Sequence, residues 1–250
     1  RMKEHDVCVQ GVTEALKAGY RAIDTAAIYQ NEEAVGEAIK ASGIARDELF
    51  ITTKVWNADQ GYDNTLKAFE QSLQKLGLDY VDLYLTHWPK PQLVDTYKAI
   101  ERLYEEKLIR VPGVSNHHEH HLQQVFAEAN VLPMVNQIEC HPSLSQDALR
   151  AFCAEHNIAV TAWAPLGTGI VFTHPVVKQL AEKYSKTPAQ IVLRWHLEIG
   201  NIVIPKSITP ERIVENLAIF DFTLQADEVA AISALNTFHR TGSDPDNFDF

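Results

Sequence analysis

The chain has 250 residues, of which 46% are hydrophobic, and its formal net charge is −11, from 33 acidic against 22 basic residues. This length suits one large α/β domain or two small ones. The acidic balance argues against a polyanionic partner such as DNA, which needs a basic face. A local basic pocket for one small phosphate is still compatible with these numbers.

The three cysteines, Cys8, Cys140 and Cys153, have no CxxC spacing. We therefore expect reduced thiols in a cytoplasmic protein. The sequence shows neither a signal-peptide pattern nor a run of 18 apolar residues. It therefore predicts neither secretion nor a membrane span.

A short apolar run, a polar loop and an amphipathic helical pattern recur roughly every 25 to 30 residues along the chain. The opening residues 4–19 already have a helical pattern. The predicted strands follow at 20–24, 49–54, 80–86, 109–115, 134–138, 159–163 and 202–205.

Helix start and stop signals lie between these runs. The apolar residues of 64–77 recur at the spacing of one helix face, and Gly77 supplies a stop. The segment 187–200 opens with Thr187 as N-cap and Pro188 in the first turn. Residues 227–236 form another predicted helix.

Alternating strands and helices require parallel strands, each covered by its helix. A single domain over residues 1–250, folded as a (β/α)8 barrel, suits this rhythm. A doubly wound sheet is the rival, but GxGxxG and GxxxxGK[ST] are both absent from the sequence. A barrel needs eight strands. We expect that the natural protein has a first strand that precedes these residues.

In such a barrel the active site lies at the C-terminal ends of the strands. Those ends and the loops after them carry Asp24, Tyr29, Lys54, His87, Trp88, Ser115, Asn116, His117, Asn136, Gln137, Glu139, Trp163, Lys206 and Ser207.

Four of these residues form a chemically coherent set. A buried ammonium at Lys54 needs a counter-ion, which Asp24 on the adjacent strand can supply. A phenol beside that ammonium, Tyr29, should have a pKa below its ordinary value of about 10 and so donate a proton near neutrality. A neutral imidazole at His87 can orient a carbonyl oxygen. Such a site suits carbonyl reduction by hydride, which must come from a cofactor.

Each member of this set also has a plainer interpretation. A lysine that ends a strand is usually solvated at the rim, a loop tyrosine usually packs, and an aspartate after a strand is often a turn cap. A single histidine is usually structural. The four residues are persuasive together because successive strands of one barrel would bring them to one mouth.

At these residues the sequence resembles the aldo-keto reductase family. The matching segments are GYRAIDTAAIYQNE, ELFITTKVWN, KLGLDYVDLYLTHWP, GVSNHHEHHL, MVNQIECHP, AWAPLGTG, IPKSITPERIVEN and IFDF, in family order. The resemblance is to microbial and protist members, which include 2,5-diketo-D-gluconate, glyoxal and methylglyoxal reductases and trypanosomatid prostaglandin F synthases. It implies Tyr29 as general acid, Lys54 with Asp24 as its activators, and His87 as the residue that positions the carbonyl.

The resemblance also implies an N-terminal hairpin before the first strand, and NADPH bound without a dinucleotide-binding fold. The implied contacts are Ser115, Asn116 and Gln137 with the nicotinamide carboxamide, Trp163 stacked on its ring, Pro165, Leu166 and Gly167 over the pyrophosphate, Lys206, Ser207 and Arg212 with the 2′-phosphate, and Glu215 and Asn216 with the adenine. Cationic and hydroxyl groups at the start of a helix make an anion site in an acidic protein. We therefore expect NADPH to be preferred over NADH.

The substrate itself is not identified by these residues. By resemblance, Trp56, Trp88 and His117 line the pocket, where an aromatic wall suits many small carbonyl compounds. The histidines of NHHEHH (116–121) lack the HExxH pattern, and we expect no metal. A non-catalytic NADP(H)-binding protein on the same fold is the alternative function. We expect a monomer with no nucleic-acid or membrane partner.

Overall fold

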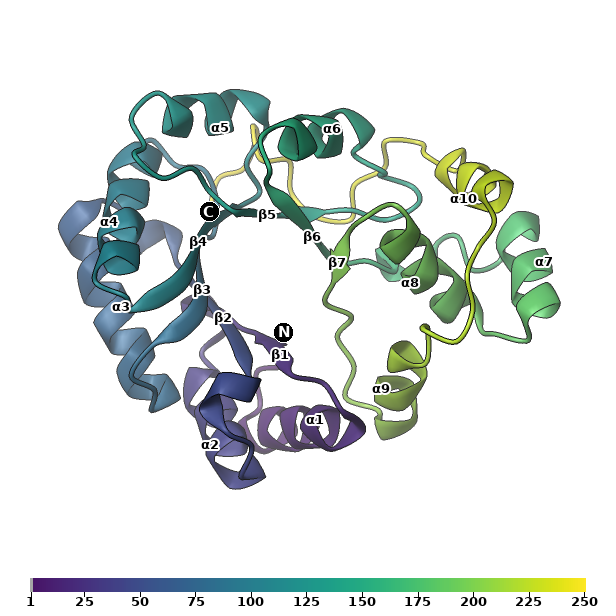
Figure 1. Ribbon diagram of the computed structural model, residues 1–250, viewed down its shortest axis with the longest axis horizontal. Helices are drawn as coiled ribbons and strands as arrows, with labels where there is room; N and C mark the ends of the chain where they lie inside the picture. Colours follow the sequence, from purple (N-terminus) through teal and green to yellow (C-terminus); the bar gives the residue numbers. More distant parts are fainter. Residues whose placement is uncertain (1) are drawn as a thin grey trace. The chain divides into compact units, whose positions relative to one another are not determined.

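The structure, a computed structural model, describes residues 2–250 (Figure 1). The chain divides into two compact units. The first extends to Asn136 and includes 208–210 and Phe250, and the second comprises 137–207 and 211–249. The single domain over 1–250 stays a prediction, and each unit is described by itself.

A seven-stranded sheet runs through the described residues, with its strands in chain order from β1 to β7. The strands are β1 (Ala22–Asp24), β2 (Phe50–Val55), β3 (Val81–Thr86), β4 (Ile109–Ser115), β5 (Val135–Glu139), β6 (Ala159–Trp163) and β7 (Ile202–Val203). The pairs β1–β2, β2–β3, β3–β4 and β6–β7 are parallel. A strictly sequential parallel order is that of a (β/α)8 barrel, whereas a doubly wound sheet reverses its order at a switch point. The predicted fold class is therefore confirmed.

Helices lie between successive strands, as the sequence pattern predicts, and also before β1 and after β7. The α-helices are α1 (His5–Ala18), α2 (Glu32–Ser42), α3 (Tyr62–Leu76), α4 (Leu93–Glu105), α5 (Glu119–Phe126), α6 (Asp147–Glu155), α7 (Pro175–Tyr184), α8 (Pro188–Glu198), α9 (Pro210–Leu217) and α10 (Ala226–Ser233). Gly77 ends α3 in the left-handed conformation, at φ 64°. Thr187 caps α8 in a capping box with Gln190. Both capping predictions are confirmed.

Several strand boundaries differ from the predicted ones. β1 begins at Ala22 rather than at residue 20, and β2, β3 and β5 each begin one residue later than predicted. β7 ends at Val203, before the predicted residue 205. Pro205 has no backbone N–H to donate, so the ladder cannot continue through it.

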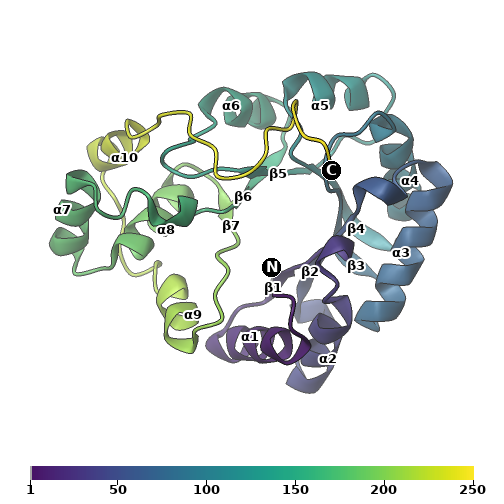
Figure 2. The ribbon, with the colours of Figure 1, turned by 180° about the vertical axis from the view of Figure 1, so that it is seen from behind.

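The strand register of the first unit places the C-terminal ends of β1, β2 and β3 side by side. Asp24 pairs with Thr52, and Lys54 pairs with Leu85 two residues before His87. Figures 1 and 2 show α1 and α2 next to each other beside β1 and β2, and the two helices are in contact. Because parallel strands end at the same edge, the side chains that follow β1, β2 and β3 gather there.

None of the helices between residues 2 and 250 has the length and apolarity that a membrane crossing requires.

Candidate active site

Lys54 is an ammonium buried completely inside the first unit. Its exposed fraction is 0%, and its Nζ donates a 2.5 Å hydrogen bond to Asp24 Oδ1 and a 2.9 Å hydrogen bond to the carbonyl oxygen of Thr25. The Asp24 side chain is 14% exposed. The predicted ion pair between the ends of two neighbouring strands is therefore confirmed.

The charge on Lys54 is maintained by its neighbours. Burial alone lowers the pKa of a lysine because it penalises the charged form. At Lys54 this effect is outweighed by Asp24 and Tyr29, which act through charge and hydrogen bonding, so that its pKa is raised. The ammonium consequently stays protonated at neutral pH beside a tyrosine side chain.

Tyr29 lies on a short 3-10 turn (Ala27–Tyr29) after β1 and is half-buried. Lys54 Nζ is 5.3 Å from the centroid of its ring. The Tyr29 ring also meets the imidazole of His87 edge-on, at 5.7 Å between centroids. The four predicted catalytic residues thus form one cluster within the first unit.

His87 is buried, and its imidazole is held neutral. Burial lowers its pKa well below the ordinary 6.5, and the positive charge of Lys54 lowers it further. Its Nδ1 has no hydrogen-bond partner among residues 2–250. A buried ring nitrogen without a partner is costly in a folded protein.

Hydrogen bonds hold the loop after β4 against the backbone of His87. Asn116 has a left-handed backbone (φ 61°), and its Nδ2 donates to the carbonyl oxygen of His87 at 2.9 Å. His117 is completely buried, and its Nδ1 lies 2.8 Å from the carbonyl oxygen of Ser115. Burial lowers the pKa of His117 to about 3, so its imidazole is neutral. His117 therefore supports the Ser115–Asn116 backbone, and its place in the pocket wall stays a prediction.

A group of aromatic rings also contacts His87. The Trp56 ring meets His87 edge-on at 5.3 Å and stacks in parallel on Phe250 at 5.9 Å. Phe250 also contacts Trp88 at 5.2 Å, and Asn57 Nδ2 donates to its carbonyl oxygen at 3.1 Å. Trp56 and Trp88 were predicted as pocket residues. Phe250 was missed because nothing local in its sequence indicates which strand loop it reaches.

Most predicted cofactor residues of the second unit lie on the loop after β6 and around α9, whereas Trp163 is the last residue of β6 and Gln137 lies in β5. The carbonyl oxygen of Pro165 accepts a 2.9 Å hydrogen bond from His196 Nε2. Gly167 has a φ of 49°, and a Cβ there would lie 2.8 Å from the ring of His141. A side chain at Gly167 is therefore excluded both by its backbone conformation and by space. Gln137, at the boundary of the units, is buried.

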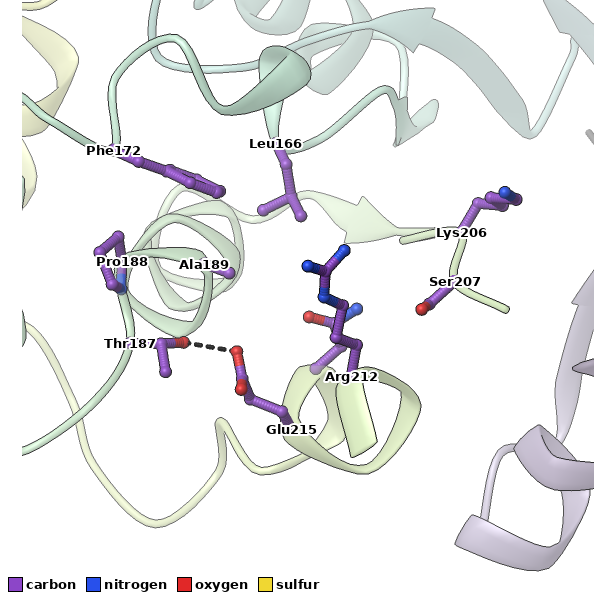
Figure 3. A pocket seen from close by; sticks show the side chains of 10 residues that line it. Leu166, Phe172, Thr187, Pro188, Ala189, Lys206, Ser207, Arg212 and Glu215 are labelled. Carbon is purple, nitrogen blue, oxygen red and sulfur yellow. Dashed lines mark hydrogen bonds between the residues drawn. The ribbon is translucent and has the colours of Figure 1, made fainter. Parts of the chain in front are cut away.

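A pocket of about 360 Å³ opens in the second unit (Figure 3). Its lining includes Leu166, Phe172, Thr187, Pro188, Ala189, Lys206, Ser207, Arg212, Glu215 and Asn216. Figure 3 shows Arg212 extending from α9 into this space, whereas Lys206 lies at the edge and turns away. Six of these residues were predicted as cofactor contacts, and the structure brings them together.

Glu215, the acidic residue of this pocket, is held in place by hydrogen bonds from α8 and its cap. Glu215 Oε1 accepts a 2.7 Å hydrogen bond from the hydroxyl of Thr187, the residue that caps α8. Gln190 donates from Nε2 to the carbonyl oxygen of Glu215 at 3.1 Å. Phe172, Thr187, Pro188 and Ala189 were missed as lining residues. The sequence reveals Thr187 as a cap but gives no sign that its hydroxyl faces a pocket.

Three imidazoles gather at the start of α5. The rings of His120 and His121 are 3.9 Å apart, and that of His118 is 5.9 Å from His121. The backbone N–H of His118 donates to His121 Nδ1, which occupies that lone pair. The positive end of a helix dipole also disfavours a cation. The absence of a metal stays a prediction.

The model of the Aldo/keto reductase family matches residues 3–237. The methylglyoxal reductase DkgA of Yersinia pestis is 54% identical over 242 residues, which are 95% of this chain and 87% of the relative. The 9,11-endoperoxide prostaglandin H2 reductase of Trypanosoma cruzi is 52% identical over 238 residues, covering 94% of this chain and 84% of the relative.

A solved structure shares the same fold. A mutant of Gox0644 in complex with NADPH superposes with a TM-score of 0.94 at 45% identity, covering 99% of this chain and 91% of that one.

Proposed function

The chain belongs to the aldo/keto reductase family, and we propose that it reduces aldehydes, α-dicarbonyls or keto-sugars to alcohols with NADPH as hydride donor. Small dicarbonyls are favoured because one relative is named a methylglyoxal reductase. A second relative is named for an endoperoxide, so membership of the family does not fix the substrate.

The observation that carries the proposal is the fully buried ammonium of Lys54, with Asp24 bonded to it and Tyr29 beside it. Burying an ammonium is expensive, and a structural role alone could be filled by an apolar side chain. A cation beside a phenol stabilises the phenolate that is left when the hydroxyl gives up its proton. The arrangement is suited to proton donation.

The chain's own residues then divide the work of reduction. NADPH supplies the hydride when it is bound. The neutral imidazole of His87 binds and orients the carbonyl oxygen of the substrate. Tyr29 donates its hydroxyl proton to that oxygen as negative charge develops on it. Asp24 keeps Lys54 in place, and Lys54 stabilises the phenolate.

The second-unit pocket fits a phosphorylated nucleoside. It combines the guanidinium of Arg212 with the hydroxyl of Ser207 just before α9, a donor set suited to phosphate. We expect Arg212→Ala to weaken NADPH binding at least ten-fold and NADH binding little, as measured by fluorescence titration. Arg102→Ala, on the exposed face of α4, is the control. Equal affinities for the two cofactors, unchanged in Arg212→Ala, would contradict the 2′-phosphate assignment.

The reaction is tested by the loss of NADPH absorbance with methylglyoxal. We expect turnover by the wild type and a decrease in kcat of about 10²- to 10⁴-fold in Tyr29→Phe, because only the proton donor is removed. NADPH binding should be nearly unchanged. Tyr62→Phe, a partly exposed tyrosine of α3, is the matched control.

Two outcomes would overturn the proposal. Near-normal turnover by Tyr29→Phe would remove this residue from its role. Tight NADPH binding by the wild type without turnover of methylglyoxal, aromatic aldehydes or keto-sugars would instead favour a non-catalytic cofactor-binding protein.

A further inference from the structure

Glu139 is a buried carboxylate at the C-terminal end of β5 that the catalytic proposal does not use. It is 1% exposed. Its Oε1 accepts hydrogen bonds from the backbone N–H of Thr241 at 2.6 Å, from the Thr241 hydroxyl at 2.5 Å and from the N–H of Gly242 at 3.2 Å. His141 Nε2 lies 3.1 Å from the same oxygen. One carboxylate thus holds two consecutive residues of the C-terminal segment.

The same segment is attached a second time nearby. The carbonyl oxygen of Ser143 accepts hydrogen bonds from the N–H groups of Thr237 at 3.2 Å and His239 at 3.0 Å. Residues 237–242, which we call the strap, are therefore attached at one end to Glu139, the last residue of β5, and at the other end to Ser143 in the loop that follows. All these contacts lie within the second unit.

The strap reaches Trp163 through Gly242. A Cβ on Gly242 would lie 2.4 Å from Cη2 of the indole and 3.2 Å from Cζ3, which is closer than side chains tolerate. The φ of Gly242 lies outside the left-handed region, so an alanine is acceptable to the backbone itself. The contact with the edge of the indole is therefore the reason for a glycine at this position.

Electrostatics makes the Glu139 attachment strong. Burial raises the pKa of a carboxyl, yet hydrogen bonds from His141 and Thr241 outweigh this effect, and the pKa of Glu139 is lowered. If the strap left, the buried carboxylate would lose three donors, which is costly. The strap is consequently held by a charged acceptor rather than by apolar contact.

We propose that Glu139 is a positioning residue. It fixes the strap against the edge of Trp163 and thereby sets the tilt of the indole on which the nicotinamide ring stacks. The inference rests on the proposed function of Trp163 as the stacking residue. It predicts that the strap controls the affinity for NADPH without taking part in proton transfer.

The first experiment compares Glu139→Gln with Glu101→Gln. Glu101 is a matched control because it is also a buried carboxylate that accepts two loop N–H groups, from Asn130 and Val131, at 2.6 Å. We expect Glu139→Gln to weaken NADPH binding at least five-fold and to speed hydrogen exchange in residues 237–242. Glu101→Gln should leave NADPH affinity unchanged. Equal NADPH affinities in the wild type and Glu139→Gln would overturn the inference.

The second experiment is a double-mutant cycle that does not disturb the buried carboxylate. Gly242→Ala should weaken NADPH binding several-fold in the wild-type background, because the new methyl group displaces the indole. In a Trp163→Phe background, where the outer indole ring is gone, the same change should have little effect. Equal losses in both backgrounds would show that the contact does not act through Trp163.

Failure of the inference and failure of the proposed function remain distinguishable. A wild-type protein that does not bind NADPH contradicts the proposed function and, with it, the role given to the strap. A wild-type protein that binds and oxidises NADPH, with variants that retain its affinity, contradicts the strap alone. If Glu139→Gln does not fold, the double-mutant cycle at Gly242 still tests the strap, since Gly242 is exposed and its substitution leaves the buried carboxylate in place.

Discussion

At the scale of single residues, the unusual feature is a charged amine with no access to water. Lys54 has two oxygen partners, Asp24 Oδ1 and the carbonyl oxygen of Thr25, which together replace its hydration. Burial lowers the pKa of His87, and the positive charge of Lys54 lowers it further. One buried cation therefore helps to keep the neighbouring imidazole neutral.

Phe250 is the residue-scale feature that leads to a prediction about substrates. Its ring stacks on Trp56, which itself contacts His87, and meets Trp88 edge-on. Aromatic contacts of this kind contribute about 0.5–1.5 kcal/mol. We expect Phe250→Ala to raise KM for a nitrobenzaldehyde roughly 2- to 10-fold, with a smaller change for methylglyoxal, which has no ring to stack.

Steady-state kinetics with the two substrates checks this expectation. Phe220→Ala is the matched control, because Phe220 is a phenylalanine that is 68% exposed and lies outside the strap. If Phe250→Ala changes KM equally for the aromatic and the small substrate, the phenyl ring does not form part of an aromatic wall.

The sequence predicts the catalytic cluster well and its surroundings less well. Asp24 and Lys54 are recognisable because they lie at the C-terminal ends of β1 and β2, and His87 because it follows β3. Parallel register brings such positions to one edge. The contacts of Phe250 join residues that are far apart along the chain. No local pattern encodes such a pairing, and neither does one encode the hydrogen bond between Thr187 and Glu215.

At the scale of elements, α2 and α3 approach each other through a glycine. A Cβ on Gly36 would lie 2.2 Å from the carbonyl oxygen of Leu76, at the last residue of α3. The obstacle is backbone, which cannot turn aside as a side chain can. Helix propensity favours alanine over glycine by about 1 kcal/mol, so a purely local view predicts stabilisation.

We expect the opposite sign. Gly36→Ala should lower the free energy of unfolding by about 1–3 kcal/mol, because overpacking forces the helices apart. Urea unfolding of the full chain measures it. Lys40→Ala, an exposed position of the same helix, should change stability by less than about 0.5 kcal/mol. A stabilised Gly36→Ala variant would show that α2 and α3 can move apart without loss of stability.

The elements themselves were largely predictable, and their ends were not. The apolar runs and helical periods identify every strand of the sheet because each element buries one face. Ends depend on partners elsewhere. β1 starts at Ala22 because pairing with Phe50 begins there, and β7 is limited to the two residues that pair with Thr161 and Ala162. Such limits follow from the neighbouring strand rather than from the segment's own residues.

At the scale of the whole molecule, several buried histidines are kept neutral. Burial is the largest cause at His87, His117 and His196. It lowers the pKa of His87 well below 6.5, and the pKa values of His117 and His196 to about 3. In the unfolded chain each returns to about 6.5. Below that pH the unfolded state therefore binds more protons than the folded state.

This difference fixes the sign of the pH dependence. Stability rises with pH wherever the unfolded state binds more protons, so it must fall as the pH decreases below about 6.5. Each buried histidine contributes up to about 1.4 kcal/mol per pH unit, and the three together up to about 4 kcal/mol. Glu139, whose pKa is lowered, acts in the same direction only near and below its unfolded pKa of about 4.3.

Urea unfolding at pH 7.5, 6.5 and 5.5 therefore measures how proton uptake by the histidines changes the free energy of unfolding. Carboxylates titrate below this pH range. We expect little change between the first two values and a steep loss of stability between the last two. Replacing His196 by Gln should reduce the slope by about one proton, whereas His174→Gln, in the exposed cap of α7, should not. A stability that is flat down to pH 5.5 would mean that the three imidazoles accept protons in the folded protein, His87 among them. That result would also remove the neutral carbonyl-orienting group from the proposed mechanism.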